Sequence, residues 1–436
     1  MSSQFKLLKE RRFLPLFITQ FLGALNDNVL KNAMVILIAF QGAKLTSASP
    51  SLMVNVCAGL FILPFFLFSA TSGQLADKFE KSKLIQLVKV LEIVIMLIAA
   101  VGFWLPNLPW LLTALFLMGM HSTLFGPIKY SILPQHLHEN EMVGGNGLIE
   151  SGTFLAILLG TILGGTLIGL GEFGAHLVAG TCFAIAIMGY IASRGIPKAP
   201  APEPDMVINW NPFTETWRNL AALKQNRTVF LAILGISWFW FYGAVFLSQF
   251  PAFAKDYLGG SEGLVTLLLA IFSIGIGLGS LLCEKLSKHT VEPGLVPLGS
   301  IGLTLFAIDL WFFSPHAGAL GLGVIEFLDN AGSIHILIDL VMIGVFGGFY
   351  CVPLYALMQT RSEESHRSRI IAANNIMNAA FMVVAALLAI VLLSFGITVP
   401  QIFLLTGIVN AGIAIYIYSL VPEFTNRFVV WIFQRK

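Results

Sequence analysis

The chain has 436 residues, of which 57% are hydrophobic and 11% are charged, and its formal net charge is +2. A soluble protein carries roughly 25% charged residues, so this composition cannot cover a water-exposed surface, and the small net charge argues against nucleic-acid binding. With a mean hydropathy of +0.84, the alternative solvent is lipid, where backbone groups must pair inside helices or a closed barrel. The apolar runs have the length of membrane-spanning helices. The composition therefore predicts an all-α integral membrane protein.

Twelve apolar runs follow one another along the chain. The first follows a basic N-terminus and lacks a small-residue cleavage site, so we interpret it as a span and not as a signal peptide. The predicted spans are 14–40, 52–72, 84–105, 109–133, 147–170, 175–193, 227–250, 264–285, 296–314, 335–358, 371–395 and 399–421.

The basic residues are unevenly divided between the two sides that these spans define. If the N-terminus is cytoplasmic, the cytoplasmic segments hold 21 of the 25 lysines and arginines. Cytoplasmic loops are the basic ones in multi-pass proteins. We therefore expect a multi-pass membrane protein with both termini in the cytoplasm.

A polar segment, 194–226, separates two groups of six spans. It opens with four prolines, which act as a semi-rigid spacer. Phe213, Trp217, Leu220 and Leu223 then recur at helical spacing, which predicts an amphipathic helix at the membrane interface. The predicted organisation is an N-terminal half (1–193), this cytoplasmic linker, a C-terminal half (227–421) and a cytoplasmic tail (422–436).

Two matching segments suggest that the halves are related. Gly73–Lys78 ends the second span with an acid and a base, and Ser280–Lys285 ends the eighth in the same way. The segment from Gly73 to Lys83 resembles the loop signature of the major facilitator superfamily, although Glu80 stands where a second glycine is usual. The resemblance implies two six-helix halves that rock around a central cavity. The residues predicted to gate its cytoplasmic side are Asp77, Lys78, Glu284 and Lys285.

Polar residues inside the spans are the candidates for substrate binding, because ionisable groups at mid-membrane are costly. The densest group lies in span one, where Asp27 and Lys31 are one turn apart and able to pair. The alternative is a self-neutralised pair that only orders the helices. The group's other members are Gln20, Asn26, Asn28 and Asn32.

Further candidates lie in spans four, five, seven and eleven. Lys129 could form a cytoplasmic gate with Glu150, or could instead extend to the interface. Lys89 and Glu92 form a second candidate pair, whereas His335 and Asp339 are expected to pair at the outer interface. The remaining candidates are Tyr130, Trp238, Tyr242, Asn374 and Asn378. We expect no metal or cofactor, since the four cysteines are scattered within apolar runs.

Three stretches are similar to the bacterial lysophospholipid transporter family: Gln20–Asn28, Gly126–Pro134 and Gly145–Glu150. The resemblance implies inward flipping of lysophosphatidylethanolamine-like lipids across the bacterial inner membrane for reacylation, with Asp27 and Lys129 matching the family's acid and lysine. The arginine expected in span seven has no counterpart among 237–249. The tail at 422–431 resembles the junction to acyltransferase and acyl-carrier-protein synthetase domains, which implies functional coupling to such enzymes. A monomer is expected.

Other functions remain open on the sequence alone. A proton-coupled exporter of drugs or siderophore-like metabolites is the main alternative, although 160–165 lacks the proline of the antiporter signature. A scaffold would not need the charges of span one. An enzyme is disfavoured, because neither a phosphate-binding loop nor a nucleophile elbow occurs.

Overall fold

The computed structural model describes residues 4–45, 50–105, 107–223, 226–315, 323–329 and 331–433, and these residues form helices and connecting loops without a strand. Twelve of the helical segments in these ranges are long and apolar enough to cross a membrane. They overlap all twelve predicted spans, so the predicted all-α multi-pass fold is confirmed. The last three residues of the predicted tail, 434–436, lie outside the described residues.

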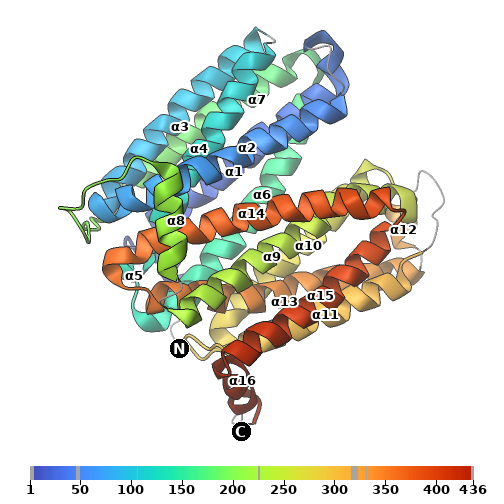
Figure 1. Cartoon of the computed structure of the whole chain (residues 1–436). Helices are drawn as coiled ribbons and strands as arrows, with labels where there is room; N and C mark the ends of the chain where they lie inside the picture. Colours follow the sequence, from blue (N-terminus) through green and yellow to red (C-terminus); the bar gives the residue numbers. More distant parts are fainter. Residues whose placement is uncertain are drawn as a thin grey trace. The chain divides into compact units, whose positions relative to one another are not determined.

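The α-helices, labelled as in Figure 1, are α1 (Leu14–Leu45), α2 (Pro50–Lys78), α3 (Lys81–Trp104), α4 (Leu108–Ser131), α5 (Leu133–His136), α6 (Met142–Ile168), α7 (Gly174–Ser193), α8 (Pro212–Ala222), α9 (Arg227–Ala252), α10 (Glu262–Leu286), α11 (Leu295–Phe313), α12 (Val324–Leu328), α13 (Ala331–Arg361), α14 (Arg367–Ser394), α15 (Val399–Leu420) and α16 (Glu423–Phe433).

Side chains at the helix ends define where several spans begin. Glu80 caps α3, because its carboxylate accepts hydrogen bonds from the backbone nitrogens of Ser82 and Lys83 at 2.9 and 3.0 Å. Thr398 caps α15 in a reciprocal arrangement with Gln401. Such contacts satisfy backbone donors that the helix leaves without a partner. The glutamate in the loop signature therefore has a local structural role.

The chain forms two compact units. Unit 1 comprises residues 1–138, 156–226 and 362–376, and unit 2 comprises 139–155, 227–361 and 377–436. The first turns of α6 thus belong to unit 2, while those of α14 belong to unit 1. Each unit therefore contains a helical segment from the other sequence half.

In unit 1, α2 and α3 pack against α4, and α7 packs against α1 and α3 (Figure 1). Their contact surfaces form an apolar core that includes Val29, Ile95 and Met118. The later part of α6 approaches α1 closely: a Cβ at Gly164 would lie 2.5 Å from the carbonyl oxygen of Val29, and one at Gly160 would lie 2.6 Å from that of Leu25. Glycines four residues apart are typical of tightly packed membrane helices.

In unit 2, α13 packs against α9, α10 and α11, and α15 packs against α9 and α11. Glycines again allow the close contacts, since a Cβ at Gly275 would lie 2.4 Å from the carbonyl oxygen of Val341. The spans formed by α9 and α13 are the two most buried of the described spans.

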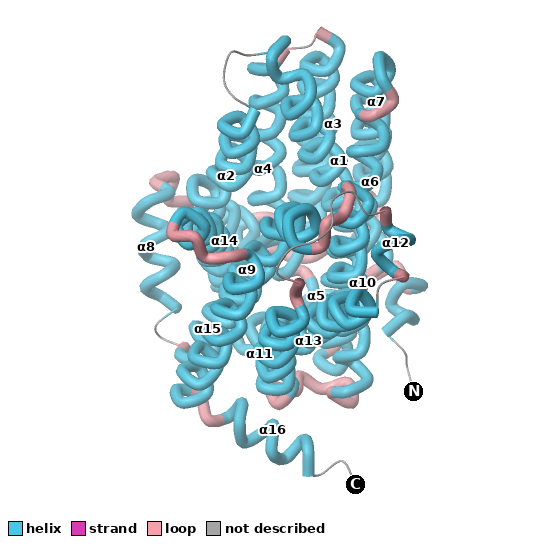
Figure 2. Tube along the Cα trace, turned by 90° about the vertical axis from the view of Figure 1, so that its right-hand side faces the viewer, coloured by secondary structure: helices cyan, strands magenta, loops and turns pink. Residues whose placement is uncertain are grey.

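Two short helices lie outside these bundles. On α8, Phe213 and Trp217 are exposed whereas Glu215 and Asn219 are buried, the reverse of a water-facing helix. The helix α16 follows α15 (Figure 2), and its Trp431 indole nitrogen donates to the carbonyl oxygen of Leu286 at 2.9 Å. Short helices with exposed apolar side chains are typical of the membrane interface.

Candidate functional site

The acid of span one is held by a neighbouring helix. Ser122 on α4 donates its hydroxyl to Asp27 Oδ2 at 2.6 Å, while Asp27 Oδ1 is buried and has no hydrogen-bond partner. Lys31 does not form an ion pair with Asp27; its ammonium group lies 5.5 Å from the centre of the Phe61 ring. The direct ion pair that the sequence allowed is therefore not formed between these two described residues.

A second polar network lies next to Asp27. Asn26 donates its amide to Glu92 Oε1 at 2.7 Å, and the other oxygen, Oε2, forms an ion pair with Lys89. His121 Nε2 also lies 3.2 Å from Glu92 Oε2. All four side chains are buried. The predicted Lys89–Glu92 pair is thus present, and it is part of a network that joins α1, α3 and α4.

Glycines make room for the lysine of this network. A Cβ at Gly189 on α7 would lie 2.6 Å from Lys89 Cε, and one at Gly23 on α1 would lie 3.4 Å from its Nζ. A larger residue at Gly189 would displace the ammonium group. The network therefore depends on four helices of unit 1.

The other amides of span one differ in what they contact. Asn28 donates to the carbonyl oxygen of Ala24 at 2.8 Å, within its own helix. Asn32 donates to the carbonyl oxygen of Asn28 and to the Thr161 hydroxyl at 3.1 Å. Gln20 is buried. These bonds order α1 against α6 and leave fewer amide groups for a ligand than the sequence suggested.

Exposure separates the residues that can touch a ligand from those that cannot. Asp27 and Lys31 are partly exposed, whereas Asn26, Lys89 and Glu92 are buried. The buried set positions α1, and the partly exposed acid and base can bind a zwitterionic group. An anionic phosphate suits Lys31 and an ammonium group suits Asp27.

Lys129 and Glu150 lie in different units. The Lys129 ammonium group is 4.4 Å from the centre of the Tyr130 ring in unit 1, and Tyr130 itself is buried. Glu150 is buried in unit 2. A gate formed by this lysine and this glutamate stays a prediction.

In unit 2, the aromatic candidates of α9 take part in interhelical packing. Trp238 donates its indole nitrogen to Asn410 Oδ1 on α15 at 2.8 Å, and Tyr242 donates its hydroxyl to the carbonyl oxygen of Leu303 on α11 at 2.9 Å. Both side chains are buried. These bonds give each residue a structural role. Their predicted contacts with a substrate stay predictions.

The asparagines of α14 are one turn apart and belong to different units. Asn378 accepts a hydrogen bond from the Ser237 hydroxyl at 2.8 Å in unit 2. Asn374 is buried in unit 1, and neither its side-chain oxygen nor its nitrogen has a hydrogen-bond partner. Buried amides usually have partners. Asn374 therefore lacks a structural bond of the kind that Asn378 makes, and its predicted ligand contact stays a prediction.

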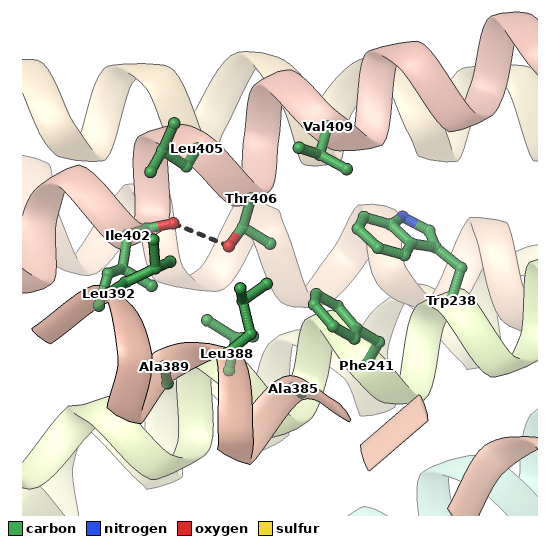
Figure 3. A pocket seen from close by; sticks show the side chains of 11 residues that line it. Trp238, Phe241, Ala385, Leu388, Ala389, Leu392, Ile402, Leu405, Thr406 and Val409 are labelled. Atoms are coloured by element: carbon green, nitrogen blue, oxygen red, sulfur yellow. Dashed lines mark hydrogen bonds between the residues drawn. The ribbon is translucent and has the colours of Figure 1, made fainter. Parts of the chain in front are cut away.

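Trp238 also borders a small apolar cavity of about 60 Å³ between α9, α14 and α15 (Figure 3). The one hydroxyl in its lining, that of Thr406, donates to the carbonyl oxygen of Ile402 within α15 (Figure 3). The almost wholly apolar lining suits part of a hydrocarbon chain and not a polar head group.

The predicted gating acid of α2, Asp77, is buried and contacts partly exposed charged residues of unit 1. Asp77 accepts hydrogen bonds from the backbone nitrogen of Ser368 at 3.2 Å and from Arg369 Nε at 3.0 Å, both at the start of α14. Arg369 also donates to Glu203 Oε2 at 2.7 Å. We call Asp77, Arg369 and Glu203 the charged latch. It joins α2, the linker and α14, which come from three parts of the sequence.

The other predicted gating residues are not members of this latch. Lys78 lies over the Phe79 ring, with its ammonium group 5.9 Å from the ring centre. In unit 2, Glu284 contacts His289 Nδ1 at 3.1 Å, and Lys285 is exposed. The two sequence copies of the loop therefore have different surroundings.

Sequence reasoning missed Ser122, His121 and Arg369. A signal existed for the first two, because adjacent polar residues inside an apolar span are unusual. Arg369 looked like one more basic residue of a cytoplasmic loop. Its contact with Asp77, 292 positions earlier, arises only when α14 packs on α2.

Comparison with known proteins agrees with this architecture. A family model described as "Major Facilitator Superfamily" matches residues 16–333. The chain is similar to a protein of Cronobacter sakazakii named lysophospholipid transporter LplT, with 29% identity over 82% of each chain. A protein of the same name from Serratia proteamaculans is 27% identical, again over 82% of each chain.

Solved structures show the same fold. A fucose:proton symporter of E. coli, FucP, has a TM-score of 0.68 at 13% identity, covering 94% of this chain and 99% of that one. A bacterial homologue of the iron transporter ferroportin has a TM-score of 0.63 at 15% identity, covering 96% and 99%. At such low identity these two structures indicate the fold alone.

Proposed function

Because the chain belongs to the Major Facilitator Superfamily, we propose that it is a secondary transporter that flips lysophospholipids across the bacterial inner membrane for reacylation. The observation that carries the proposal is the acid and base of α1. Asp27 and Lys31 are partly exposed in a membrane-spanning helix and do not form an ion pair with each other. The names of the relatives favour a single-chain phospholipid over an exported drug.

The physical chemistry of an amphiphile supports this choice. Carrying a sixteen-carbon chain through water would cost on the order of 12 kcal/mol, at about 0.8 kcal/mol per methylene. A lipid transporter therefore gains by leaving the chain in an apolar environment and offering a polar path to the head group alone. Asp27 and Lys31 supply such a path for an amine and a phosphate.

The proposed mechanism is rocking of the two sequence halves around a central cavity, with both termini in the cytoplasm. The charged latch would hold the cytoplasmic side, because Asp77 lies at the basic end of α2. A disulfide cross-link between the cytoplasmic ends of spans four and ten should stop transport, whereas undiminished transport would refute rocking. We further propose that the transporter acts as a monomer and passes its substrate to a separate acyltransferase system.

The experiment that tests the function is a flipping assay in liposomes. Purified protein is reconstituted, and transbilayer movement of labelled lysophosphatidylethanolamine is followed beside diacyl phosphatidylethanolamine and a cationic dye. Asp27→Asn should lose lysolipid movement, because an amide cannot offer a charge to an ammonium group. Asp205→Asn, which changes an exposed linker aspartate, is the matched control.

Two outcomes would contradict the proposal. Dye movement driven by a proton gradient, without lysolipid movement, would establish the exporter. Equal lysolipid movement by wild type and Asp27→Asn would remove Asp27 from the polar path.

A further inference from the structure

Three ligand-type side chains converge in unit 2, far from the span-one cluster in sequence. Asp309 on α11 and His335 and Asp339 on α13 place a nitrogen and two carboxylate oxygens within 4.8 Å of one another. They lie near the end of α11 and the start of α13, opposite to the end that carries Arg361 and Glu423. We call these three residues the aspartate–histidine cluster. From this cluster we infer a binding site for one divalent transition-metal ion.

The contacts within the cluster leave one ligand atom unsatisfied. His335 Nε2 lies 2.9 Å from Asp309 Oδ2 and 3.9 Å from Asp339 Oδ2. The Asp339 side chain is 1% exposed, and its Oδ2, which faces the histidine, is buried without a hydrogen-bond partner. A buried carboxylate oxygen without a donor is costly. A cation between the three side chains would satisfy it.

One divalent ion balances the charges of the cluster, whereas a single proton does not. With a protonated histidine, two carboxylates leave one negative charge in excess. A divalent cation bound to two carboxylates and a neutral imidazole brings the total to zero. Neutrality matters here because Asp339 is buried inside a membrane-spanning helix, where an unbalanced charge is costly.

The ligand types indicate which ions would bind. Imidazole suits zinc, cobalt and related first-row ions, while carboxylates suit manganese and magnesium. One nitrogen with two oxygens therefore fits Zn²⁺, Co²⁺ or Mn²⁺ better than Ca²⁺, which prefers six to eight oxygens. Three protein ligands also leave positions on the metal for water.

Neighbouring side chains orient the His335 ring, and part of the aspartate–histidine cluster is exposed. The ring of Phe313 lies 3.8 Å from the His335 ring, measured between centres, and this contact limits how the imidazole can turn. Asp309 and His335 are each about two-fifths exposed. An ion can therefore reach the cluster from outside the protein.

The site would connect α11 to α13. Bonds of about 2.0–2.2 Å from a metal to each ligand atom require the three side chains to shift by a small amount, with Asp339 moving toward His335. The metal would take the place of a proton between His335 and Asp309, so binding should release protons. It should also raise the thermal stability of the whole protein, because an ion that binds only the folded chain stabilises it.

The experiment is a titration of the purified full-length protein with Co²⁺, whose visible absorption reports its ligands, followed by displacement with Zn²⁺. We expect one equivalent of Co²⁺ in wild type. His335→Gln, Asp309→Asn and Asp339→Asn should each lower the affinity at least about tenfold. Zn²⁺ should raise the Tm of wild type and not that of these variants. His176→Gln, at an exposed histidine of α7, is the matched control and should behave as wild type.

Several results would overturn the inference. If wild type takes up no more Co²⁺ than Asp309→Asn, the cluster is only a hydrogen-bonded group. Equal loss in His176→Gln would show that binding occurs at surface histidines in general. Because Asp339→Asn alters a buried side chain and could unfold the protein, Asp309→Asn, at a partly exposed position, decides the question. The readout is metal binding, so the result does not depend on lysolipid transport.

Discussion

Asn26 on α1 donates its side-chain amide to Glu92 on α3 across 2.7 Å, one residue before the aspartate proposed to meet the head group. Glu92 is simultaneously the partner of the buried Lys89. The position of Asp27 is therefore tied to an ion pair on another helix. The polar path and the stability of unit 1 depend on the same carboxylate.

The first prediction concerns this carboxylate. Glu92→Ala should destabilise the protein by about 3–5 kcal/mol, because it leaves Lys89 as an uncompensated buried charge. The double variant Lys89→Met with Glu92→Leu should recover part of the loss, since apolar pairs often replace buried ion pairs at little cost. Thermal unfolding in detergent measures both, with Glu139→Ala, at an exposed glutamate, as control. A Glu92→Ala variant as stable as this control would exclude the buried pair.

The second prediction concerns the hydroxyl that holds Asp27. Ser122→Ala removes the 2.6 Å hydrogen bond to Asp27 Oδ2. Hydrogen bonds to charged groups contribute about 1.5–3 kcal/mol, so lysolipid movement should slow by roughly tenfold or more. Ser122→Thr keeps a hydroxyl and should retain most of the rate in the liposome assay. Equal rates for the alanine and threonine variants would show that the hydroxyl does not matter.

The third prediction concerns the cap of α3. Glu80→Ala should cost about 1 kcal/mol of stability, because two backbone donors of the first turn lose their acceptor. Thermal unfolding at neutral pH measures this cost. Glu80→Gln retains one side-chain oxygen and should cost less, and an alanine variant of unchanged stability would contradict the capping role.

The same residue should give a pH dependence. Partial burial acts to raise the pKa of Glu80, but hydrogen bonds from Ala199, Ser82 and Lys83 outweigh it and hold the pKa below its ordinary value. A carboxyl whose pKa is depressed in the folded state stabilises the protein above its unfolded pKa, about 4.3. That contribution is lost as the pH falls through the lower folded pKa. Wild type should therefore lose its advantage over Glu80→Gln on acidification, and a constant difference in Tm would contradict this assignment.

The fourth prediction concerns the charged latch. Asp77 and Arg369 are in direct contact, so Asp77→Ala and Arg369→Ala should not have additive effects on stability. A double-mutant cycle should give a coupling energy of about 0.5–3 kcal/mol. Lys78→Ala, whose side chain lies over Phe79, should show no such coupling to Arg369→Ala. Additive effects of Asp77→Ala and Arg369→Ala would mean that the contact contributes nothing.

Composition and hydropathy alone indicate that the protein lies in lipid, that it is helical and how many helices cross the membrane. A chain with so few charges can only be stable in lipid, and there the backbone must form helices of a length set by the bilayer. The polar residues of span one also stood out, because ionisable groups are costly in lipid wherever they lie in the fold. The partners of those residues were not predictable, since side chains one turn apart on a helix need not contact each other. Lys31 lies over Phe61, while Asp27 binds Ser122, 95 positions away.

Which polar residues share a site depends on how the helices pack against one another, and this packing could not be read from the spacing along the chain. His335 and Asp339 were visible as neighbours on one helix, but Asp309 joins them because α11 packs against α13. In the same way Arg369 reaches Asp77 because the start of α14 belongs to unit 1. Local spacing fixes contacts within a helix, whereas contacts between helices depend on small residues, such as Gly164 and Gly275, that set how closely the backbones approach.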